Sequence, residues 1–365
     1  MLQPIVENGA DRTVLLLQPE DLRGVVSIGE AIDLVEQGYR EAAEYPLMNA
    51  PRRRVHSRKN VRLSSFPGGV DGLGVIGSLA RAELVEITDS VQKIAYQDHP
   101  VYVLWDAGTA RLSAIMIGQI VERQLGSSKR MALRTGATSG VGFRHLVRKD
   151  ARTAGVIGTG EQAIHKVLAL QNERDITLYK VYSRSSENRD GFCAKLRTFV
   201  KAEVIAVETS EEAVRSSDVI ICATSSNVPV FDGEWLEPGQ HVVSVVGSNS
   251  ALVDGGWLSG GRRETDDRTA ERASFIVTNW RESVEQERQA SLIEPIEKGV
   301  ISWDKVHELG DILTGKVPGR TSDDQITFHA NGNGTAAADL AIAQFVYGRC
   351  RELGKGTVLN VSPSQ

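Results

Sequence analysis

The chain has 365 residues, of which 41% are hydrophobic, and its formal net charge is −5. This length predicts two domains, or one domain with an elaborated partner, and enough apolar residues for a large core. The acidic balance argues against a nucleic-acid-binding protein, and no apolar run reaches the length of a membrane span.

The N-terminus and the cysteines indicate a cellular compartment. The first residues lack the basic-then-apolar order of a signal peptide. The cysteines at 193, 222 and 350 are far apart and fit neither a metal knuckle nor a disulfide framework. No H-x-x-H or C-x-x-C pattern offers a metal site. We therefore expect buried, reduced thiols in a cytoplasmic protein without a metal.

The first part of the chain predicts an α+β region rich in antiparallel strands. Residues 14–17 are typical of a short strand, and Ser27 with Glu30 forms a capping box that opens a helix. A basic run follows at residues 51–63, where most side chains are expected to be simply solvated. Further strands are predicted at 75–82, 102–105 and 111–116.

The middle of the chain contains a glycine turn between an apolar strand and a helix of apolar period. The segment from 153 to 170 reads TAGVIGTGEQAIHKVLAL, which contains the G-x-G-x-x-A form of the dinucleotide fingerprint. The turn offers close backbone approach and a helix N-terminus to a pyrophosphate. An ordinary βα turn is the alternative interpretation. The predicted cofactor-binding residues here are Gly158, Thr159, Gly160, Glu161, Gln162 and Ala163.

Regular alternation of strands and helices follows, which predicts a parallel, doubly wound sheet. The expected strands are 154–157, 176–182, 203–207, 219–222, 241–246 and 275–277. Polar or glycine residues come after the later strands, and the carboxyl ends of such strands line the cofactor crevice. These residues are Thr224, Ser225, Ser226, Gly247, Ser248 and Asn249. Residues 327–334 are interpreted as a glycine-rich turn that ends at a helix starting near Thr335.

The tip of the second strand of this sheet bears on the choice of cofactor. NAD enzymes usually place an acidic residue there to bind the ribose hydroxyls. This chain has Ser183 and Arg184 instead, with Arg189 close behind and Glu187 between them. A serine and an arginine suit a 2′-phosphate, so the sequence favours NADP(H) over NAD(H), with NAD(H) still possible.

Several motifs, in this order and spacing, resemble the ornithine cyclodeaminase/mu-crystallin family. They are Pro51-Arg52-Arg53, Arg134-Thr135-Gly136-Ala137-Thr138, the glycine turn, Arg263-Glu264-Thr265-Asp266, and Asp324-Gln325-Ile326-Thr327 with Gly332, Gly334 and Asp339. The resemblance covers nearly the whole chain. It implies a Rossmann dinucleotide-binding domain at 147–334, inserted into an α+β domain for substrate binding and dimerisation at 1–146 plus 335–365. The active site would lie in the cleft between them.

The resemblance also implies roles for single residues. Arg53, preferred over its two arginine neighbours on the P-x-R spacing, and Arg134 would hold a substrate carboxylate, as a planar guanidinium can. Arg134 has a capping or phosphate-facing role as the alternative. Ile76 stands where the family usually has a lysine, and Arg81 is the candidate replacement, with a surface pair to Glu83 as the alternative.

Two further residues have competing interpretations. Asp266 matches the family's acidic residue, and a carboxylate near an imine can stabilise or supply a proton. It also precedes a helical segment, where it would act as an N-cap. His329 is a possible nicotinamide or substrate contact, although a single histidine is more often structural.

The function that follows is an NAD(P)H-dependent oxidoreductase acting on the C–N bond of a small imino or amino acid. Imine or ketimine reductases and amino-acid dehydrogenases belong to this class. Two alternatives stay open: a redox-neutral cyclodeaminase that uses tightly bound NAD and releases ammonia, and a non-catalytic NADP(H)-dependent ligand-binding protein. The missing lysine argues against the cyclodeaminase. The resemblance also implies a homodimer.

Overall fold

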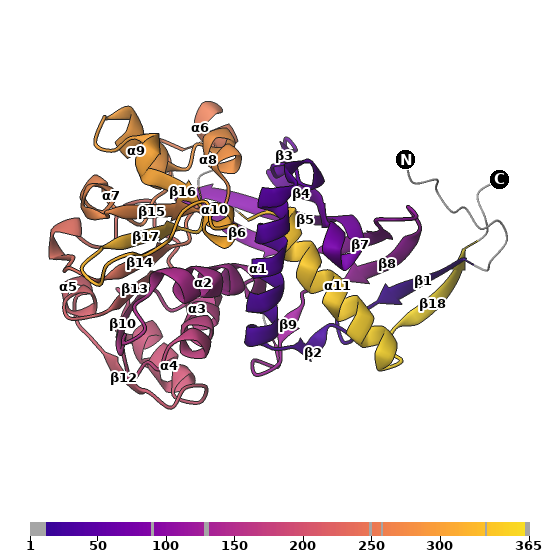
Figure 1. The fold of residues 1–365 in the computed structure, drawn as a ribbon, viewed down its shortest axis with the longest axis horizontal. Coiled ribbons are helices and arrows are strands. Elements are labelled where there is room, and N and C mark those ends of the chain that lie inside the picture. Colours follow the sequence, from indigo (N-terminus) through magenta and orange to yellow (C-terminus); the bar gives the residue numbers. More distant parts are fainter. Residues whose placement is uncertain are drawn as a thin grey trace. The chain divides into compact units, whose positions relative to one another are not determined.

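The computed structural model describes residues 12–88, 91–127, 131–247, 250–256, 258–332 and 334–361 (Figure 1). The chain divides into two compact units. The first comprises Met1–Glu86, Ile94–Arg134 and Thr335–Gln365, and the second comprises Ile87–Lys93 and Thr135–Gly334. The sequence analysis placed the first boundary at 146/147 instead. The difference arises because a helix begins in the first unit at Leu133 and continues through Leu146 in the second.

The first unit is built around a mixed sheet whose hairpin strands pair antiparallel, as expected. Its order is β18-β1-β8-β7-β5-β4-β3, with β6 pairing to β5 off this path. The strands are β1 (Arg12–Leu17), β3 (Arg53–His56), β4 (Val61–Val70), β5 (Val75–Thr88), β6 (Val91–Gln97), β7 (Val101–Asp106), β8 (Leu112–Ile117) and β18 (Thr357–Val361). A separate two-stranded sheet joins β2 (Arg23–Val26) to β9 (Val121–Glu122).

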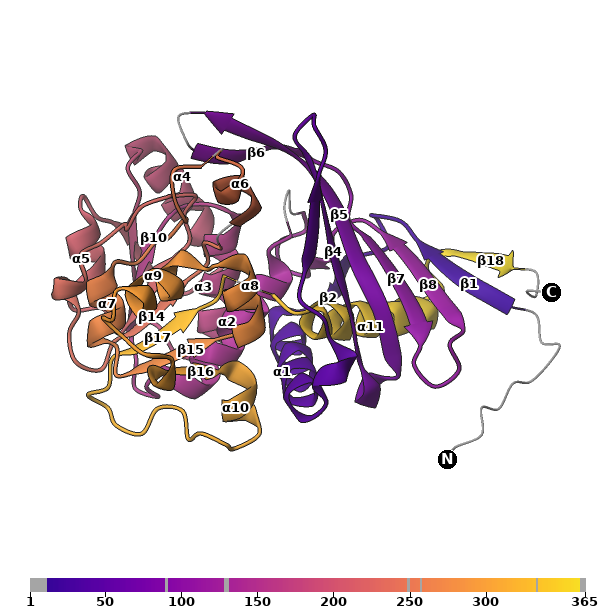
Figure 2. The ribbon, with the colours of Figure 1, turned by 90° about the horizontal axis from the view of Figure 1, so that it is seen from above.

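Two long helices pack against each other in the first unit and contact β4 (Figure 2). They are α1 (Ile28–Glu44) and α11 (Ala336–Glu352). The predicted capping box is present, since the Ser27 N–H donates to Glu30 Oε2 at 2.8 Å and the Glu30 N–H donates to Ser27 Oγ at 3.3 Å. At Gly38 a Cβ would lie 2.9 Å from the carbonyl oxygen of Ala337, so the absence of a side chain lets these helices approach closely.

The second unit contains an eight-stranded sheet of order β12-β11-β10-β13-β14-β17-β15-β16, and its pairs are parallel. This confirms the predicted doubly wound α/β fold. The strands are β10 (Thr153–Ile157), β11 (Leu178–Tyr182), β12 (Glu203–Ala206), β13 (Val219–Cys222), β14 (His241–Ser244), β15 (Phe275–Thr278), β16 (Val306–Glu308) and β17 (Thr327–Ala330).

The helices of this unit are α2 (Leu133–Leu146), α3 (Glu161–Glu173), α4 (Ser186–Leu196), α5 (Ser210–Val214), α6 (Ser250–Asp254), α7 (Asp267–Arg272), α8 (Arg281–Glu287), α9 (Ala290–Glu297) and α10 (Leu309–Leu313). The sequence interpretation of residues 327–334 as a turn was wrong for its first four residues. They form β17, which is fully buried between β14 and β15. A Thr-Phe-His-Ala run has the β-branched and aromatic residues of a strand.

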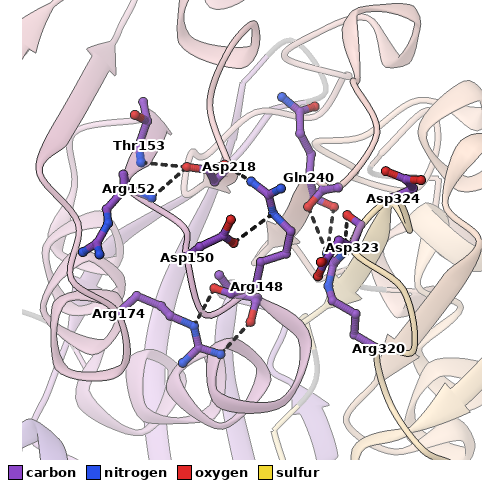
Figure 3. A network of polar contacts seen from close by, with 12 residues as sticks. Arg148, Asp150, Arg152, Thr153, Arg174, Asp218, Gln240, Arg320, Asp323 and Asp324 are labelled. Atoms are coloured by element: carbon purple, nitrogen blue, oxygen red, sulfur yellow. Dashed lines mark hydrogen bonds and ion pairs between the residues drawn. The ribbon is translucent and has the colours of Figure 1, made fainter.

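A polar network connects the segments that precede the strands of the second sheet, at the N-terminal ends of these strands (Figure 3). Asp218 accepts hydrogen bonds from the backbone N–H groups of Arg152 and Thr153 at 2.7 and 2.9 Å, and it pairs with Arg148. Arg320 donates to several backbone carbonyls, including Gln325 O at 2.6 Å. These contacts satisfy backbone groups at the edge opposite the glycine turn.

The remaining general expectations concern cysteines and membranes. The three cysteines are buried and form no disulfide. Within the described ranges, none of the helices combines the length and the apolar character that a membrane crossing needs.

Candidate functional site

The glycine turn of the second unit has the geometry of a dinucleotide cradle. Gly158 has φ +113°, and a Cβ there would lie 2.3 Å from the carbonyl oxygen of Ala223, so only glycine fits. Gly160 is the N-cap of α3 in extended conformation, and apart from its chain neighbours no atom of the described residues lies within 4 Å of the position of a Cβ. The space over Gly160 is therefore open on the side from which a pyrophosphate would approach.

The start of α3 supports the same use. The N-cap residue is a glycine, so the N-cap position itself has no side chain that could bind the first N–H groups. Such an N-terminus attracts phosphate through its N–H groups and its dipole. Ala163 is fully buried beneath the turn, while Thr159, Glu161 and Gln162 are half-buried around it. The residues present thus fit a dinucleotide.

The tip of β11 lies beside the glycine turn, because the Gly158 N–H donates to Tyr182 O at 3.0 Å. Ser183 follows directly and is half-buried, and Arg184 is exposed. Arg189 is buried and pairs with Glu208 at 2.7 Å. Ser183 and Arg184 are therefore the side chains at the tip that suit a 2′-phosphate.

The ends of β13 and β14 are joined by a buried carboxylate that the sequence analysis did not single out. Oε1 of Glu264 accepts from the backbone N–H and the hydroxyl of Thr224 at 2.6 and 2.8 Å. Oε2 accepts from the N–H groups of Val245 and Val246 at 2.8 and 3.0 Å. Glu264 is 1% exposed, so this carboxylate fixes two neighbouring strand ends in the crevice region.

The other residues predicted in this region lie on the same strand ends. Ser225 is exposed, and its carbonyl oxygen accepts from Arg262 at 2.9 Å. Gly247 is half-buried. The predicted positions Ser248 and Asn249 lie outside the described residues.

Asp266 occupies the N-cap position of α7, which is the alternative that the sequence left open. Its Oδ1 accepts from the backbone N–H and the hydroxyl of Thr269, both at 2.7 Å. Its Oδ2 accepts from the Gly233 N–H at 2.9 Å. Both oxygens thus accept from backbone N–H groups, which shows the N-cap contacts and leaves the catalytic role of Asp266 a prediction.

His329 lies in the core of the second unit. It is fully buried on β17, with Nε2 2.8 Å from Asn279 Oδ1. Burial lowers the pKa of His329 to about 3, with Lys166 adding to the effect, so the imidazole is neutral. A Cβ on Gly142 would come within 2.4 Å of His329 Nδ1. These contacts give His329 the structural role that a single histidine more often has.

In the first unit, side chains alternate between the two faces of the sheet along each strand, and this alternation determines which arginines share a face. The pairing of β3, β4 and β5 puts Phe66 opposite Leu79 and Ser64 opposite Arg81. Arg52 and Arg81 both lie over the Phe66 ring, at 5.6 and 5.7 Å from its centroid. We call the face that carries Phe66 the arginine face.

The predicted carboxylate ligand Arg53 points elsewhere. It is exposed and pairs with Ser65, on the side of the sheet opposite to Phe66. Arg52, one residue earlier, is 8% exposed and lies on the arginine face. The reason is the two-residue alternation of an extended chain, which one residue of register reverses.

Arg134 and Asp339 form an ion pair on the first unit, with Nε and Oδ1 3.2 Å apart. Asp339 belongs to α11, 205 residues further along the chain. Burial opposes the charge of Arg134, but Asp339 and the nearby tyrosines 39 and 102 raise the pKa of its guanidinium. The guanidinium keeps its charge, and the Arg134 side chain as a whole is 18% exposed.

Arg81 lies near Arg134 but on the opposite face from Ile76. The pairing of β4 and β5 is uninterrupted from 75 to 84, so no bulge brings the two side chains together. Ile76 is 42% exposed on the outer face. Arg81 pairs with Glu83 at 3.6 Å, as the alternative interpretation proposed, but Glu83 is buried and not on the surface. Arg81 therefore does not occupy the position of the missing lysine.

Glu83 is shared between two arginines. Its Oε2 accepts from Arg62 Nε and Nη2 at 2.9 and 2.6 Å. Burial would raise the pKa of Glu83, but Arg81 and Arg62 hold it below its ordinary value.

Within the described part of the chain, no group of three or more His, Cys, Asp or Glu side chains is placed to hold a metal ion.

A parallel α/β unit with an open glycine turn defines the class of dinucleotide-binding proteins. The chain belongs to the ornithine cyclodeaminase/mu-crystallin family, whose model matches residues 12–354. The resemblance seen in the sequence motifs is thereby confirmed.

The chain is similar to characterised members along nearly its full length. It is 27% identical to a Delta(1)-pyrroline-2-carboxylate reductase of Bacillus cereus, over 94% of this chain and 98% of that protein. It is 28% identical to an alanine dehydrogenase of Archaeoglobus fulgidus, over 91% and 94%. The solved Delta(1)-pyrroline-2-carboxylate reductase of Thermococcus litoralis, in complex with NADH and L-proline, matches with a TM-score of 0.78 at 27% identity, over 94% of this chain and 99% of that one.

Proposed function

We propose that this protein is an NAD(P)H-dependent oxidoreductase that reduces the C=N bond of a small imino acid, or oxidises the corresponding amino acid. The observation that carries the proposal is the open space over Gly160 at the uncapped start of α3. It occurs in a chain that shares its family with imine reductases and an alanine dehydrogenase.

The chain's own residues have two tasks in this reaction. The glycine turn and α3 hold the pyrophosphate of the dinucleotide, and the bound cofactor supplies or accepts the hydride. Arg134, kept charged by Asp339, holds the substrate carboxylate. We assign the second carboxylate contact to Arg52 in place of Arg53, because Arg52 lies on the arginine face.

The reaction balances without a further reductant. A hydride adds to the imine carbon, the π electrons of the C=N bond move to nitrogen, and nitrogen ends with a proton as an amine. A protonated imine already carries that proton, so the protein need not donate one. This agrees with the contacts of Asp266, whose oxygens hold backbone groups.

For the cofactor we propose NADP(H) in preference to NAD(H). Support comes from Ser183 and Arg184 at the tip of β11, where neither residue is acidic. Arg184→Ala should raise the KM for NADPH at least about tenfold and leave that for NADH nearly unchanged, since a charged contact contributes about 1.4 kcal/mol or more. Equal effects on both cofactors would contradict the preference.

The test of the function is a screen of cofactor oxidation. Purified protein with NADPH or NADH is offered cyclic ketimines, and 2-oxo acids with ammonia or methylamine, and absorbance of the reduced nicotinamide is followed. Turnover supports the proposal. Ammonia release from a diamino acid without net absorbance change would identify the cyclodeaminase instead. Cofactor binding without turnover on any substrate would identify a binding protein.

We also propose a homodimer. The outer face of β3, β4 and β5, opposite to the arginine face, exposes a row of large apolar side chains. Val55, Val61, Leu63, Ile76 and Leu84 are 62%, 40%, 44%, 42% and 37% exposed. Exposed apolar side chains on one sheet face are typical of an interaction site, and we assign a second copy of this chain to it.

The mass of the protein in solution tests this assignment. Leu63→Glu should convert a dimer into a monomer in light scattering, because it places a charge in the centre of the patch. Leu47→Glu is the matched control, since Leu47 is 84% exposed in the same unit but lies outside these strands. A monomeric unmodified protein would contradict the assignment.

A further inference from the structure

The arginine face contains a second cationic position besides Arg134. Arg81 lies directly opposite Ser64 on the neighbouring strand, so their side chains project from the same face. Ser64 is fully buried, and its hydroxyl makes no hydrogen bond to any described residue. Nε of Arg81 likewise has no hydrogen-bond acceptor among the described residues. The Ser64 hydroxyl and Arg81 Nε are thus two neighbouring donors that lack an acceptor among the described residues.

The carboxylate nearest to Arg81 does not supply that acceptor. Glu83 uses Oε2 for the two hydrogen bonds from Arg62. Its Oε1 lies 3.6 Å from Arg81 Nε and makes no hydrogen bond within the described structure. Glu83 therefore balances the charge of Arg62 by direct contact and that of Arg81 only at longer range.

Arg81 and Arg134 are two separate anchors. Arg81 lies 3.6 Å from Glu83 and Arg134 lies 3.2 Å from Asp339, and the two arginine side chains keep 19% and 18% exposure. In the proposed function, Arg134 and Arg52 already provide both contacts to the α-carboxylate. A substrate with a single carboxylate would leave Arg81 Nε and the Ser64 hydroxyl without an acceptor from the ligand, which is unfavourable for buried donors.

We propose that the substrate carries a second acidic group, which binds Arg81 and the Ser64 hydroxyl while its α-carboxylate binds Arg134. The inference rests on the proposed function and narrows its substrate class to imino or amino acids with an acidic side chain. The second group takes no part in bond making. It fixes the orientation of the substrate and excludes apolar analogues, because a carboxylate on Arg81 replaces water that an apolar group cannot replace.

The experiment compares acids that differ by one carboxylate. With methylamine and the reduced cofactor, kcat/KM is measured for 2-oxoglutarate and oxaloacetate against 2-oxobutyrate and pyruvate. The unmodified protein should prefer the dicarboxylates. Arg81→Gln should lower their kcat/KM about 30-fold or more, as expected when one partner of a buried charge pair is removed. The same variant should change kcat/KM for the monocarboxylates by less than about threefold, because the proposal gives these acids no direct contact with Arg81.

Two serines supply a matched pair of variants. Ser64→Ala removes the buried hydroxyl and should reduce the preference for dicarboxylates. Ser65→Ala is the control, because Ser65 lies on the opposite face, where its hydroxyl is 3.3 Å from that of Ser78. Arg81→Lys keeps the charge and should restore part of the preference.

A binding measurement tests the second acidic group independently of the proposed reaction. Protein saturated with cofactor is titrated with glutarate or with butyrate, and the shift in melting temperature is recorded. A larger stabilisation by glutarate that disappears in Arg81→Gln supports the second acidic group even if no oxo acid turns over, which would reject only the proposed reaction. Equal stabilisation by both acids, or equal loss for both in Arg81→Gln, would show that Arg81 and Arg134 clamp one carboxylate together, and would overturn the inference.

Discussion

Thr224 donates two hydrogen bonds, from its backbone N–H and its hydroxyl, to one carboxylate oxygen of Glu264. The other oxygen accepts from the backbone N–H groups of Val245 and Val246, which directly follow β14. Each carboxylate oxygen therefore serves two donors. The strand ends that this carboxylate joins follow β13 and β14, on which the sequence analysis placed cofactor contacts.

The first prediction concerns this arrangement. Glu264→Gln leaves an acceptor oxygen on one side only, so two of the four donors lose their partner whichever way the amide is turned. We expect a loss of about 2–4 kcal/mol in the free energy of unfolding, together with weaker cofactor binding. Urea denaturation and a fluorescence titration with NADPH measure the two effects. Glu285→Gln is the control, since Glu285 forms only an exposed pair with Arg281. Unchanged denaturation of Glu264→Gln would contradict the structural role.

The second prediction separates the two interpretations of Asp266. Asn is as good an N-cap as Asp, but its amide nitrogen cannot accept from the Gly233 N–H. Asp266→Asn should therefore cost about 1 kcal/mol of unfolding free energy and keep most of the activity. Asp266→Ala should cost about 1–2 kcal/mol of unfolding free energy. Thermal denaturation and initial rates on the best substrate provide both measurements. A stable Asp266→Asn protein that has lost turnover would restore the catalytic interpretation.

The third prediction uses two glycines with open surroundings. A Cβ at Gly160 or at Gly191 meets no atom within 4 Å, so Ala at either position should leave the fold intact. Only Gly160 lies in the proposed cradle. Gly160→Ala should therefore weaken dinucleotide binding at least about tenfold, or about 1.4 kcal/mol, whereas Gly191→Ala should leave it unchanged. Calorimetric titration measures the affinity of both variants for NADPH. Equal affinities would mean that the pyrophosphate does not bind at Gly160.

The fourth prediction follows from the pKa of His329, which burial lowers to about 3 from the ordinary 6.5. Because the folded pKa lies below the unfolded one, this residue contributes stability that is present above pH 6.5 and is lost as the pH falls toward 3. Between about pH 6.5 and about pH 5 the loss is about 2 kcal/mol.

Urea denaturation of a matched set of variants measures this loss. His329→Gln removes the titrating group, so its unfolding free energy should fall less between about pH 7 and about pH 5 than that of the unmodified protein. His99→Gln, at an exposed position, should show the unmodified pH dependence. Parallel curves for all three proteins would mean that His329 is protonated in the folded state.

The sequence predicted the second unit better than the first, for a physical reason. The glycine turn, the parallel order and the helix after it depend on residues close in the chain, such as Gly158 and Ala163. β17 was missed because a four-residue strand buried on all sides carries too short a pattern beside its glycine-rich neighbour.

Roles that depend on partners distant in sequence were harder to predict. Arg53 and Arg52 are equivalent in a run of three arginines until a register fixes which one faces Phe66. Glu264 was recognised as part of a motif, but its donors come from two other strands. The pairing of Arg134 with Asp339 likewise spans 205 residues.

The first unit is discontinuous, and this has a consequence for biosynthesis. A ribosome delivers α11 and β18 last, after the whole of the second unit has been made. Until then α1 lacks the helix on which it packs, Arg134 lacks Asp339, and β1 lacks its antiparallel neighbour β18. Nascent chains commonly mature from the N-terminal domain onward. Here the inserted unit is the one that can mature first, and the first unit must wait, with its apolar surface uncovered, until α11 and β18 have been synthesised.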